Sequence, residues 1–502
     1  MKKIFAIMMI ICLLASVLCI TAFAADLPAE DVVLRVSALK RDGTTIVIKD
    51  YTVFEDGWNA AMELADNSKE MKKNDYARVI VDIYADWNAV DGEFTKEFFN
   101  GKGFNWDAIY FQPNVRMTLN LNGHTINRGL TDWEYNGEVM YIDKDADVII
   151  NDGTITGGFS CNGAGGIHIN DGANVVLNNV NIVGNAVEDD DGAGIAVYDG
   201  ATLTMIGGRV SDNFMKCSDV SLVYGAGIYI EDCTANFFNV TFQNNHSKGQ
   251  SAYCQDQFEA YCTYGAAIYA EQSTVTIDTC CFYDNGHKLG NFIDTDCVIR
   301  VTKSKMTVKN TIFKDNGCGQ IVTNGHSSFE LSTKLFNTYN SALTIESCRF
   351  IENKASVLLC LDSDSTLIIS DTTFTDNNAA IYYGAVASTM TSSVSNCTFD
   401  RNRASGKYPY LFEFTDEGNQ PTFVDCDFGN STFNNKSLAT FIDSNADVSN
   451  DAHLGTLIGQ GNISMFLSLL AIFIACTALC VGVNKDKRVK ALFERTSNES
   501  ND

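Results

Sequence analysis

A short strand motif recurs through the middle of the chain and limits the possible folds more than any other feature. In Val275–Asn285, Leu343–Asn353 and Val394–Asn402, apolar and polar residues alternate, and a small residue, an aromatic anchor and a later asparagine follow. The anchors recur at intervals of 24 to 40 residues: Ile126, Ile155, Ile182, Val210, Phe242, Phe282, Phe313, Phe350, Phe374, Phe399 and Phe428. An asparagine lies three places beyond eight of them: Asn185, Asn213, Asn245, Asn285, Asn316, Asn353, Asn377 and Asn402.

A second, glycine-rich motif precedes the anchors by about 14 residues and has the forms GGIHI (165–169), GAGIAV (192–197), GAGIYI (225–230) and GAAIYA (265–270). Alternation with period two, together with β-branched and aromatic residues, predicts three short strands in each repeat. Because no helices separate these strands, each is expected to pair in parallel with its equivalent in the next repeat. The sequence therefore predicts an all-β parallel β-helix solenoid of about eleven rungs.

Two further positions of the repeat have predictable roles. The position two before the anchor is expected to form an inward column of small residues with free thiols, since parallel side-chain vectors oppose disulfide geometry: Cys280, Cys348, Cys397 and Cys426. The position three before the anchor holds residues that tolerate left-handed backbone angles or cap turns, which predicts a bend: Asn179, Asn239, Thr279, Asn310, Ser347, Asp371, Asn396 and Asp425. Cys254 and Cys262, in one long loop, are the pair that we consider for a disulfide.

The repeat resembles two known groups of proteins. The steps FQNN, FYDN, FKDN, FIEN, FTDN and FDRN, with the Gly-Ala-Ile steps, resemble the repeats of chlamydial polymorphic outer-membrane proteins. The strand order resembles that of the pectate-lyase-like superfamily over roughly residues 115–435. This resemblance implies a right-handed coil, but it selects no activity because the superfamily includes lyases, hydrolases, adhesins and capping proteins.

The ends of the chain predict export and membrane anchorage. Residues 1–25 combine two lysines, an apolar run and an Ala-Phe-Ala cleavage site, as secretory signal peptides do. The segment 463–483 has no charged residue over 21 positions, which is long enough for a transmembrane helix, and basic residues follow it. We therefore expect a single-pass protein of the cell membrane, with the N-terminal ectodomain outside and the C-terminus in the cytoplasm.

The remaining segments complete the expected organisation. A small α/β cap should cover the first rung, with strands at Val32–Leu39 and Thr44–Tyr51 and a helix from about Trp58 to Lys69. The predicted segments are these: signal peptide 1–25, N-terminal cap 26–117, parallel β-helix 118–435, stalk 436–462, transmembrane helix 463–483 and cytoplasmic tail 484–502.

One column of side chains is a candidate glycan site. His168, Tyr229, Tyr269 and Arg300 each follow the apolar residue of a Gly-Ala-Ile strand or its equivalent, and so should point outward on that sheet. Loops such as His246–Tyr264 should rim a groove above them. Aromatic faces can contact sugar C–H groups and arginine can pair with carboxylates. The alternative is that the tyrosines only favour the strand conformation and pack across it.

A run of acidic residues is a candidate Ca²⁺ site. Glu188, Asp189, Asp190 and Asp191 are consecutive in one loop, and Ca²⁺ prefers clustered carboxylate oxygens. A solvated acidic turn explains the same run.

Charge and motifs together favour a binding function. The formal net charge of −26 disfavours nucleic acid as a partner, because phosphate binding needs clustered Lys and Arg. No catalytic residue is assigned. We therefore expect a non-catalytic surface protein for adhesion or for binding a polysaccharide, another glycan or a surface protein. The alternatives are an envelope-tethered polysaccharide lyase or glycoside hydrolase, and a structural spacer.

Overall fold

The computed structural model describes residues 30–89, 103–105, 108–216, 223–248, 263–286, 297–317, 319–324, 327–362, 364–384, 392–403, 412–414 and 422–429. The chain divides into two compact units, Met1–Val448 and Ser449–Asp502, and all described residues belong to the first. The predicted signal peptide, stalk, transmembrane helix and cytoplasmic tail lie outside these residues. Within them, no helix has the length and apolarity that a membrane span requires.

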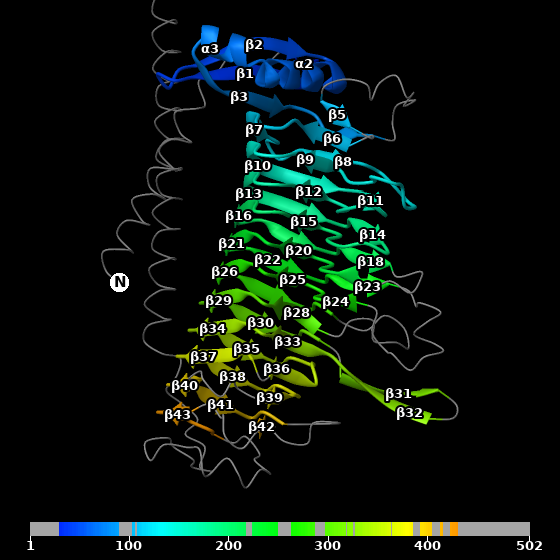
Figure 1. Cartoon of the computed structure of the whole chain (residues 1–502). Coiled ribbons are helices and arrows are strands. Elements are labelled where there is room, and N and C mark those ends of the chain that lie inside the picture. Colours follow the sequence, from blue (N-terminus) through cyan, green and yellow to red (C-terminus); the bar gives the residue numbers. More distant parts are fainter. Residues whose placement is uncertain are drawn as a thin grey trace, which may run out of the picture. The chain divides into compact units, whose positions relative to one another are not determined.

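The largest sheet has 23 strands and contains two parallel ladders (Figure 1). The first ladder consists of the Val-x-Ile strands: β7 (Arg116–Asn120), β10 (Asp147–Thr156), β13 (Asn174–Val183), β16 (Thr202–Ile206), β21 (Thr234–Phe238), β26 (Thr274–Asp278), β29 (Lys305–Lys309), β34 (Ala342–Glu346), β37 (Thr366–Ser370), β40 (Ser393–Ser395) and β43 (Thr422–Val424). The second ladder consists of the strands that contain the anchors. The long strands β10 and β13 belong to both ladders. The other strands of the second ladder are these: β8 (Thr125–Asn127), β17 (Arg209–Ser211), β22 (Thr241–Gln243), β27 (Cys281–Tyr283), β30 (Ile312–Lys314), β35 (Arg349–Ile351), β38 (Thr373–Thr375) and β41 (Thr398–Asp400).

The Gly-Ala-Ile strands form a separate sheet of 12 strands. Its members also pair in parallel, except that β5 (Phe104–Asn105) is antiparallel to its neighbour: β6 (Ala108–Phe111), β9 (Met140–Ile142), β12 (Ile167–Ile169), β15 (Ile195–Val197), β20 (Ile228–Glu231), β25 (Ile268–Glu271), β28 (Cys297–Thr302), β33 (Lys334–Tyr339), β36 (Val357–Leu361), β39 (Ala380–Gly384) and β42 (Phe412–Phe414). Three strands in each repeat, each paired with the next repeat, make a parallel β-helix, as the sequence predicts. The number of complete rungs stays a prediction.

The anchors fill the interior of the coil. Phe242, Phe282, Phe313, Phe350, Phe374, Phe399 and Phe428 are all buried. Successive rings stack, with centroids 4.5 to 5.3 Å apart. Stacking repeats the same contact at every turn and keeps equivalent strands in register. The aromatic anchors thus point into the coil.

The predicted bend and cysteine columns are also confirmed. All eight residues of the bend column have φ between 50° and 57°, so the backbone turns through the left-handed region between the two strands. The cysteines of the inward column are buried and free. The pair Cys254 and Cys262 lies outside the described residues.

The asparagines beyond the anchors form a continuous buried ladder. Each side-chain amide donates to the side-chain oxygen of the next asparagine, from Asn185 through to Asn402. At Asn316, for example, Nδ2 also donates to the Phe282 carbonyl at 2.8 Å, and Oδ1 accepts from the backbone N–H of Asn285 at 3.1 Å. These bonds satisfy the backbone where the chain leaves the sheet.

The described N-terminal residues pack onto the first turn of the coil. β1 (Leu34–Lys40) pairs with β2 (Thr45–Tyr51) and β3 (Tyr76–Ile83), and β3 pairs in parallel with β7. Helix α2 (Phe54–Asp66) buries Trp58 against Phe111, with ring centroids 5.0 Å apart. The helix begins earlier than predicted, and a separate short helix α3 (Ser68–Lys73) follows it. Strand β4 (Trp87–Asn88) pairs with β8.

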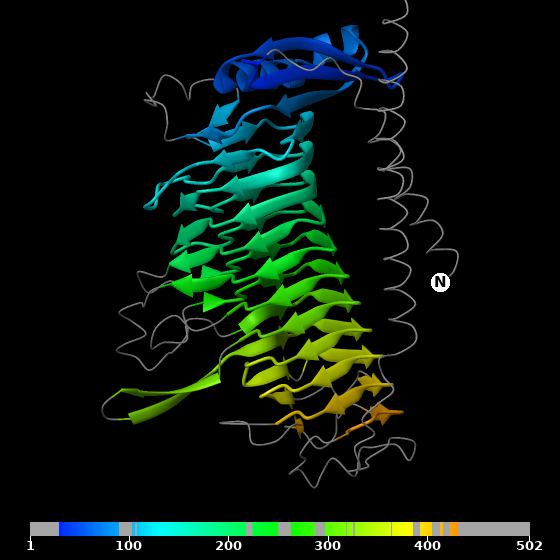
Figure 2. The same ribbon diagram turned by 180° about the vertical axis from the view of Figure 1, so that it is seen from behind.

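Three small sheets are present that the repeat pattern did not predict. Some repeats contain a fourth strand, and these additional strands pair in parallel to form the first sheet: β11 (Phe159–Ser160), β14 (Ala186–Glu188), β18 (Phe214–Lys216) and β23 (His246–Lys248). The second pairs β19 (Val223–Tyr224) with β24 (Thr263–Tyr264). The third is an antiparallel hairpin of β31 (Gly319–Asn324) and β32 (Ser327–Ser332), which projects from the stack in both views (Figures 1 and 2). The strands of the first two sheets have only two or three residues, which is too little alternation for a pattern to reveal them.

Replacing Asn316 with alanine is expected to destabilise the coil strongly. The variant leaves the buried backbone N–H of Asn285 without its side-chain acceptor, which costs about 1–3 kcal/mol, and it also removes the bonds from Asn285 Nδ2 and to the Phe282 carbonyl. We expect a loss of about 3 kcal/mol or more, measured as a lower urea midpoint. The control is Asn174→Ala, at an exposed asparagine of β13, which should change stability by no more than about 0.5 kcal/mol. Equal midpoints for the two variants would contradict a stabilising ladder.

Candidate functional site

The predicted outward column exists and is longer than the sequence analysis proposed. Tyr141, His168, Ala196, Tyr229, Tyr269 and Arg300 are register partners on successive strands from β9 to β28. Ala196 is small, and the ring of Tyr198 lies near this position. The centroid of the Tyr198 ring is 5.0 Å from that of the His168 ring and 5.4 Å from that of the Tyr229 ring. An aromatic column thus runs along the outside of this sheet.

Two of the four predicted ligand residues are covered. Tyr229 and Tyr269 are only 6% exposed, their rings stack at 5.4 Å, and Tyr224 from β19 packs 4.5 Å from Tyr269. Their hydroxyls donate to Glu231 and Glu271. These tyrosines therefore point outward but form a second small core, against which Tyr224 of β19 and Tyr264 of β24 pack. Their burial favours the packing alternative, because an open platform would leave the rings exposed.

Arg300 lies at the other end of this cluster. Its Nε donates to Thr302 Oγ1 at 3.2 Å, and its guanidinium lies 5.8 Å from the ring centroid of Tyr264. Of the four predicted ligand residues, His168 lines a pocket that the described residues form.

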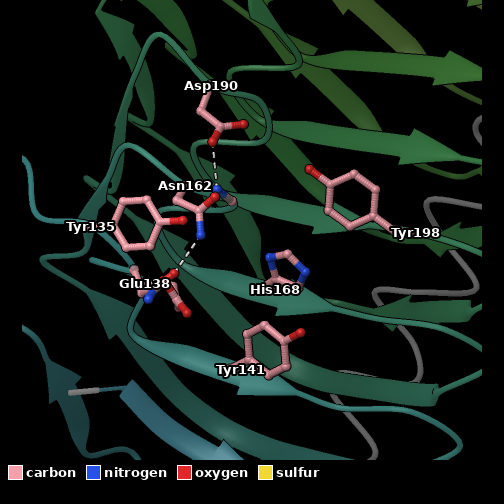
Figure 3. A pocket seen from close by; sticks show the side chains of 9 residues that line it. Tyr135, Glu138, Tyr141, Asn162, His168, Asp190 and Tyr198 are labelled. Carbon is pink, nitrogen blue, oxygen red and sulfur yellow. Dashed lines mark hydrogen bonds between the residues drawn. The ribbon is translucent and has the colours of Figure 1, made fainter. Parts of the chain in front are cut away.

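That pocket lies above the N-terminal part of the Gly-Ala-Ile sheet and has a volume of about 480 Å³. Figure 3 shows Tyr135 and Glu138 on one side and Tyr198 on the other, with Tyr141 and His168 between them. Its lining combines aromatic rings, amides and carboxylates: Tyr135, Asn136, Glu138, Tyr141, Asn162, Gly163, His168, Asp190 and Tyr198. Concave sites with a few convergent polar groups are where small ligands bind.

Three successive turns supply these residues. Tyr135 and Asn136 come from the loop between β8 and β9, and Asn162 from the loop between β11 and β12. Asp190 comes from the loop after β14. Asn162 Nδ2 donates to Asn136 Oδ1 at 2.6 Å, and the Gly163 N–H donates to Asp190 Oδ2 at 2.7 Å. These bonds fix the loops to one another across the turns (Figure 3).

Glu138 is the unusual residue of the pocket. It is 3% exposed, and its Oε2 is buried without a hydrogen-bond partner. Burial raises its pKa to about 7, with Asp190 adding to the rise and Arg128 opposing it. A buried carboxyl group with a pKa near 7 can become ionised when a cationic ligand binds, or it can donate a proton to a ligand.

His168 also has unused hydrogen-bonding capacity. Its ring stacks on Tyr141 at 4.6 Å, and its Nδ1 is buried without a hydrogen-bond partner. Burial lowers its pKa to about 4, so the imidazole is neutral at neutral pH. Most buried polar atoms in proteins are hydrogen-bonded, so two such atoms in one pocket indicate a place for ligand groups.

The acidic run does not converge on one point. Glu188 is ion-paired with Lys216 at 2.8 Å, Asp190 accepts from Gly163, and Asp191 Oδ1 accepts from the Tyr224 N–H at 2.7 Å. Asp189 has a left-handed backbone with φ of 53°. Burial raises the pKa of Asp190 and of Asp191.

These contacts give the predicted Ca²⁺ site no geometric support. In the part of the chain that the structure describes, no three His, Cys, Asp or Glu side chains are grouped so that they could hold a metal ion. The Ca²⁺ site stays a prediction.

Sequence reasoning missed Glu138, although the repeat contained a signal. By strand register, Glu138 occupies the position of Gly165, Ala193, Ala226 and Ala266 in the following turns. A carboxylate where the next four turns have a small buried residue is the exception that an alignment of the repeats would reveal. Tyr141 was missed because its strand lacks the Gly-Ala-Ile start.

The comparisons with known proteins concern the fold. The family described as "Right handed beta helix region" matches residues 226–451. With the parallel sheets, this match shows that the chain is a right-handed parallel β-helix. A search of curated protein sequences gave no match. The resemblance to polymorphic outer-membrane proteins stays one of sequence motifs.

A solved structure also matches: the catalytic unit of a thermostable GH87 alpha-1,3-glucanase from Streptomyces thermodiastaticus, with 13% sequence identity. The match covers 68% of this chain and 70% of that chain, with a TM-score of 0.24. Similarity at this level carries no argument about activity.

The raised pKa of Glu138 predicts a pH-dependent stability. The native state keeps a proton that the unfolded state releases, so stability relative to the Glu138→Gln variant is highest below pH 4.5 and falls up to about pH 7. The total loss should be on the order of 3 kcal/mol. Urea unfolding of both proteins from pH 4 to 8 measures it, and the control is Asp132→Asn, at an exposed carboxylate of the same loop. A constant difference between wild type and Glu138→Gln would contradict the raised pKa.

Proposed function

We propose that this is a membrane-anchored cell-surface protein that binds a polysaccharide or another glycan in the pocket around His168. The proposal joins two separate arguments. The apolar segments 1–25 and 463–483 support export and anchorage. The pocket supports binding of a polar ligand that carries many hydroxyl groups.

One observation carries the binding proposal: Glu138 Oε2 and His168 Nδ1 are buried, lack hydrogen-bond partners and belong to residues that line the same pocket. Hydroxyl groups can act as both donors and acceptors, so a sugar satisfies either atom in any protonation state. The rings of Tyr135, Tyr141 and Tyr198 provide apolar faces for the C–H surface of the same sugar. A spacer needs no such pocket.

The rim of the pocket has further exposed aromatic residues. Tyr135 is 67% exposed and Trp133, on the same loop, is 48% exposed. Exposed aromatic side chains beside a pocket are typical of interaction sites. A glycan longer than one sugar can therefore extend from the pocket over this loop.

Replacing Tyr135 with alanine is expected to weaken glycan binding about fivefold, because an aromatic contact contributes about 0.5–1.5 kcal/mol. The ring is exposed, so its loss should leave the fold intact. A glycan array identifies the ligand, and titration of the best glycan then measures affinity.

The matched control is Tyr339→Ala, at a tyrosine on β33 that is 48% exposed and does not line the pocket. It should bind like the wild type. If both variants lose the same affinity, the pocket is not the binding site. If the wild type binds no glycan on the array, the binding proposal is wrong.

The second candidate is a glycoside hydrolase or polysaccharide lyase. It is favoured by Glu138 and Asp190, two carboxylates in one pocket that influence each other electrostatically. Glycoside hydrolysis uses a protonated acid and a second carboxylate, and a carboxyl group with a pKa of about 7 can supply the acid. Glu138 would donate a proton to the leaving-group oxygen, and Asp190 would be the second carboxylate.

If the protein is a hydrolase, the wild type should release reducing ends from the glycan that it binds. Removing the general acid with Glu138→Gln should then lower turnover by about 100-fold or more, while binding persists. A reducing-sugar assay measures turnover, and Asp132→Asn serves as the control. Binding without any turnover in the wild type leaves the non-catalytic function as the correct one.

A further inference from the structure

The described residues that line the pocket include acidic residues but no lysine or arginine. Two of the nine lining residues, Glu138 and Asp190, are acidic. Arg128 lies close enough to oppose the rise in the pKa of Glu138, but its Nη2 is 3.7 Å from Glu134 Oε2, outside the pocket lining. His168 is neutral, with a pKa of about 4.

The walls of the pocket are aromatic. Tyr135, Tyr141, His168 and Tyr198 make up four of the nine lining residues. The rings of Tyr141 and His168 are stacked, and the centroid of the Tyr198 ring is 5.0 Å from that of His168. These three rings therefore form one continuous wall. Aromatic faces carry negative potential and attract cations, most strongly where water is excluded.

The unpartnered oxygen of Glu138 adds an independent indication of a ligand. The side chain is 3% exposed, and its Oε2 neither reaches solvent nor has a protein donor. Buried carboxylates are normally paired with a cation or with several donors. A positively charged ligand group would supply the missing partner, and the aromatic wall would surround it.

We propose that the pocket selects a protonated amine, and that the glycan it takes is one with free amino groups, such as an oligomer of glucosamine. This inference rests on the proposed glycan-binding function and names the substrate class of the same site. Neutral or acidic glycans lack the cation, and an acidic sugar would add a third negative group beside Glu138 and Asp190. The protein's net charge of −26 also attracts cationic glycans over longer distances.

The test compares three probes on the purified full chain at pH 7, close to the pKa of about 7 of Glu138: a glucosamine hexamer, the N-acetylated hexamer and tetramethylammonium. Acetylation removes the charge and keeps the sugar ring, and tetramethylammonium has the charge without a sugar. We expect the glucosamine hexamer to bind about tenfold tighter than the acetylated one.

Two variants separate the pocket from the general field of the protein. Glu138→Gln keeps the size of the side chain and removes its charge, so the preference for the amine should fall about tenfold, to near one. Asp132→Asn removes one exposed charge from the same loop and should leave the preference unchanged. An equal decrease in both variants would overturn the inference, because general attraction would then explain the preference.

The outcomes distinguish this inference from the function on which it rests. If the two hexamers bind the wild type with equal affinity, glycan binding is supported and selection of an amine is contradicted. If tetramethylammonium binds in a Glu138-dependent way and neither hexamer binds, the cation site stands and glycan binding falls. If no probe binds, both fall.

Discussion

Pairing of backbone amides between successive turns is the constraint on which the whole coil depends. Each short strand has few residues, and alone it could neither satisfy its own backbone nor bury its apolar face. Stacking equivalent strands satisfies both requirements, provided that every turn presents the same residues at the same positions. The stacked phenylalanines, the left-handed bends and the asparagine ladder are the side-chain consequences of that repetition.

The structural features that recur from turn to turn could be predicted from the sequence. The anchors, the bend residues such as Asn310 and Asp371, and the buried cysteines all occupy recurring positions, so one turn predicts the next. What differs between turns could not be predicted in the same way. Tyr229 was correctly placed outside the coil, but its exposure depends on residues outside the repeat motif, such as Tyr224 of β19, whose position no periodicity encodes.

The pocket follows from departures from the repeat. It forms where Glu138 replaces a small residue and where Ala196 leaves room for the ring of Tyr198. Loops from neighbouring turns then close around these positions through the bonds of Asn162 and Asp190. A regular scaffold thus holds an irregular site rigidly, which favours specific binding because little order is lost when a ligand arrives.

The asparagine ladder also determines how the coil transmits a disturbance along its axis. Nδ2 of Asn316 bonds both to Phe282 in the preceding turn and to Asn353 in the following one, so a single amide joins three turns. In a linear array with contacts only between neighbours, the terminal turns can open one at a time. An interior turn that opens breaks amide bonds to both of its neighbours, whereas an end turn breaks bonds to one, so we expect opening to begin at the ends of the array and to cost more in its middle.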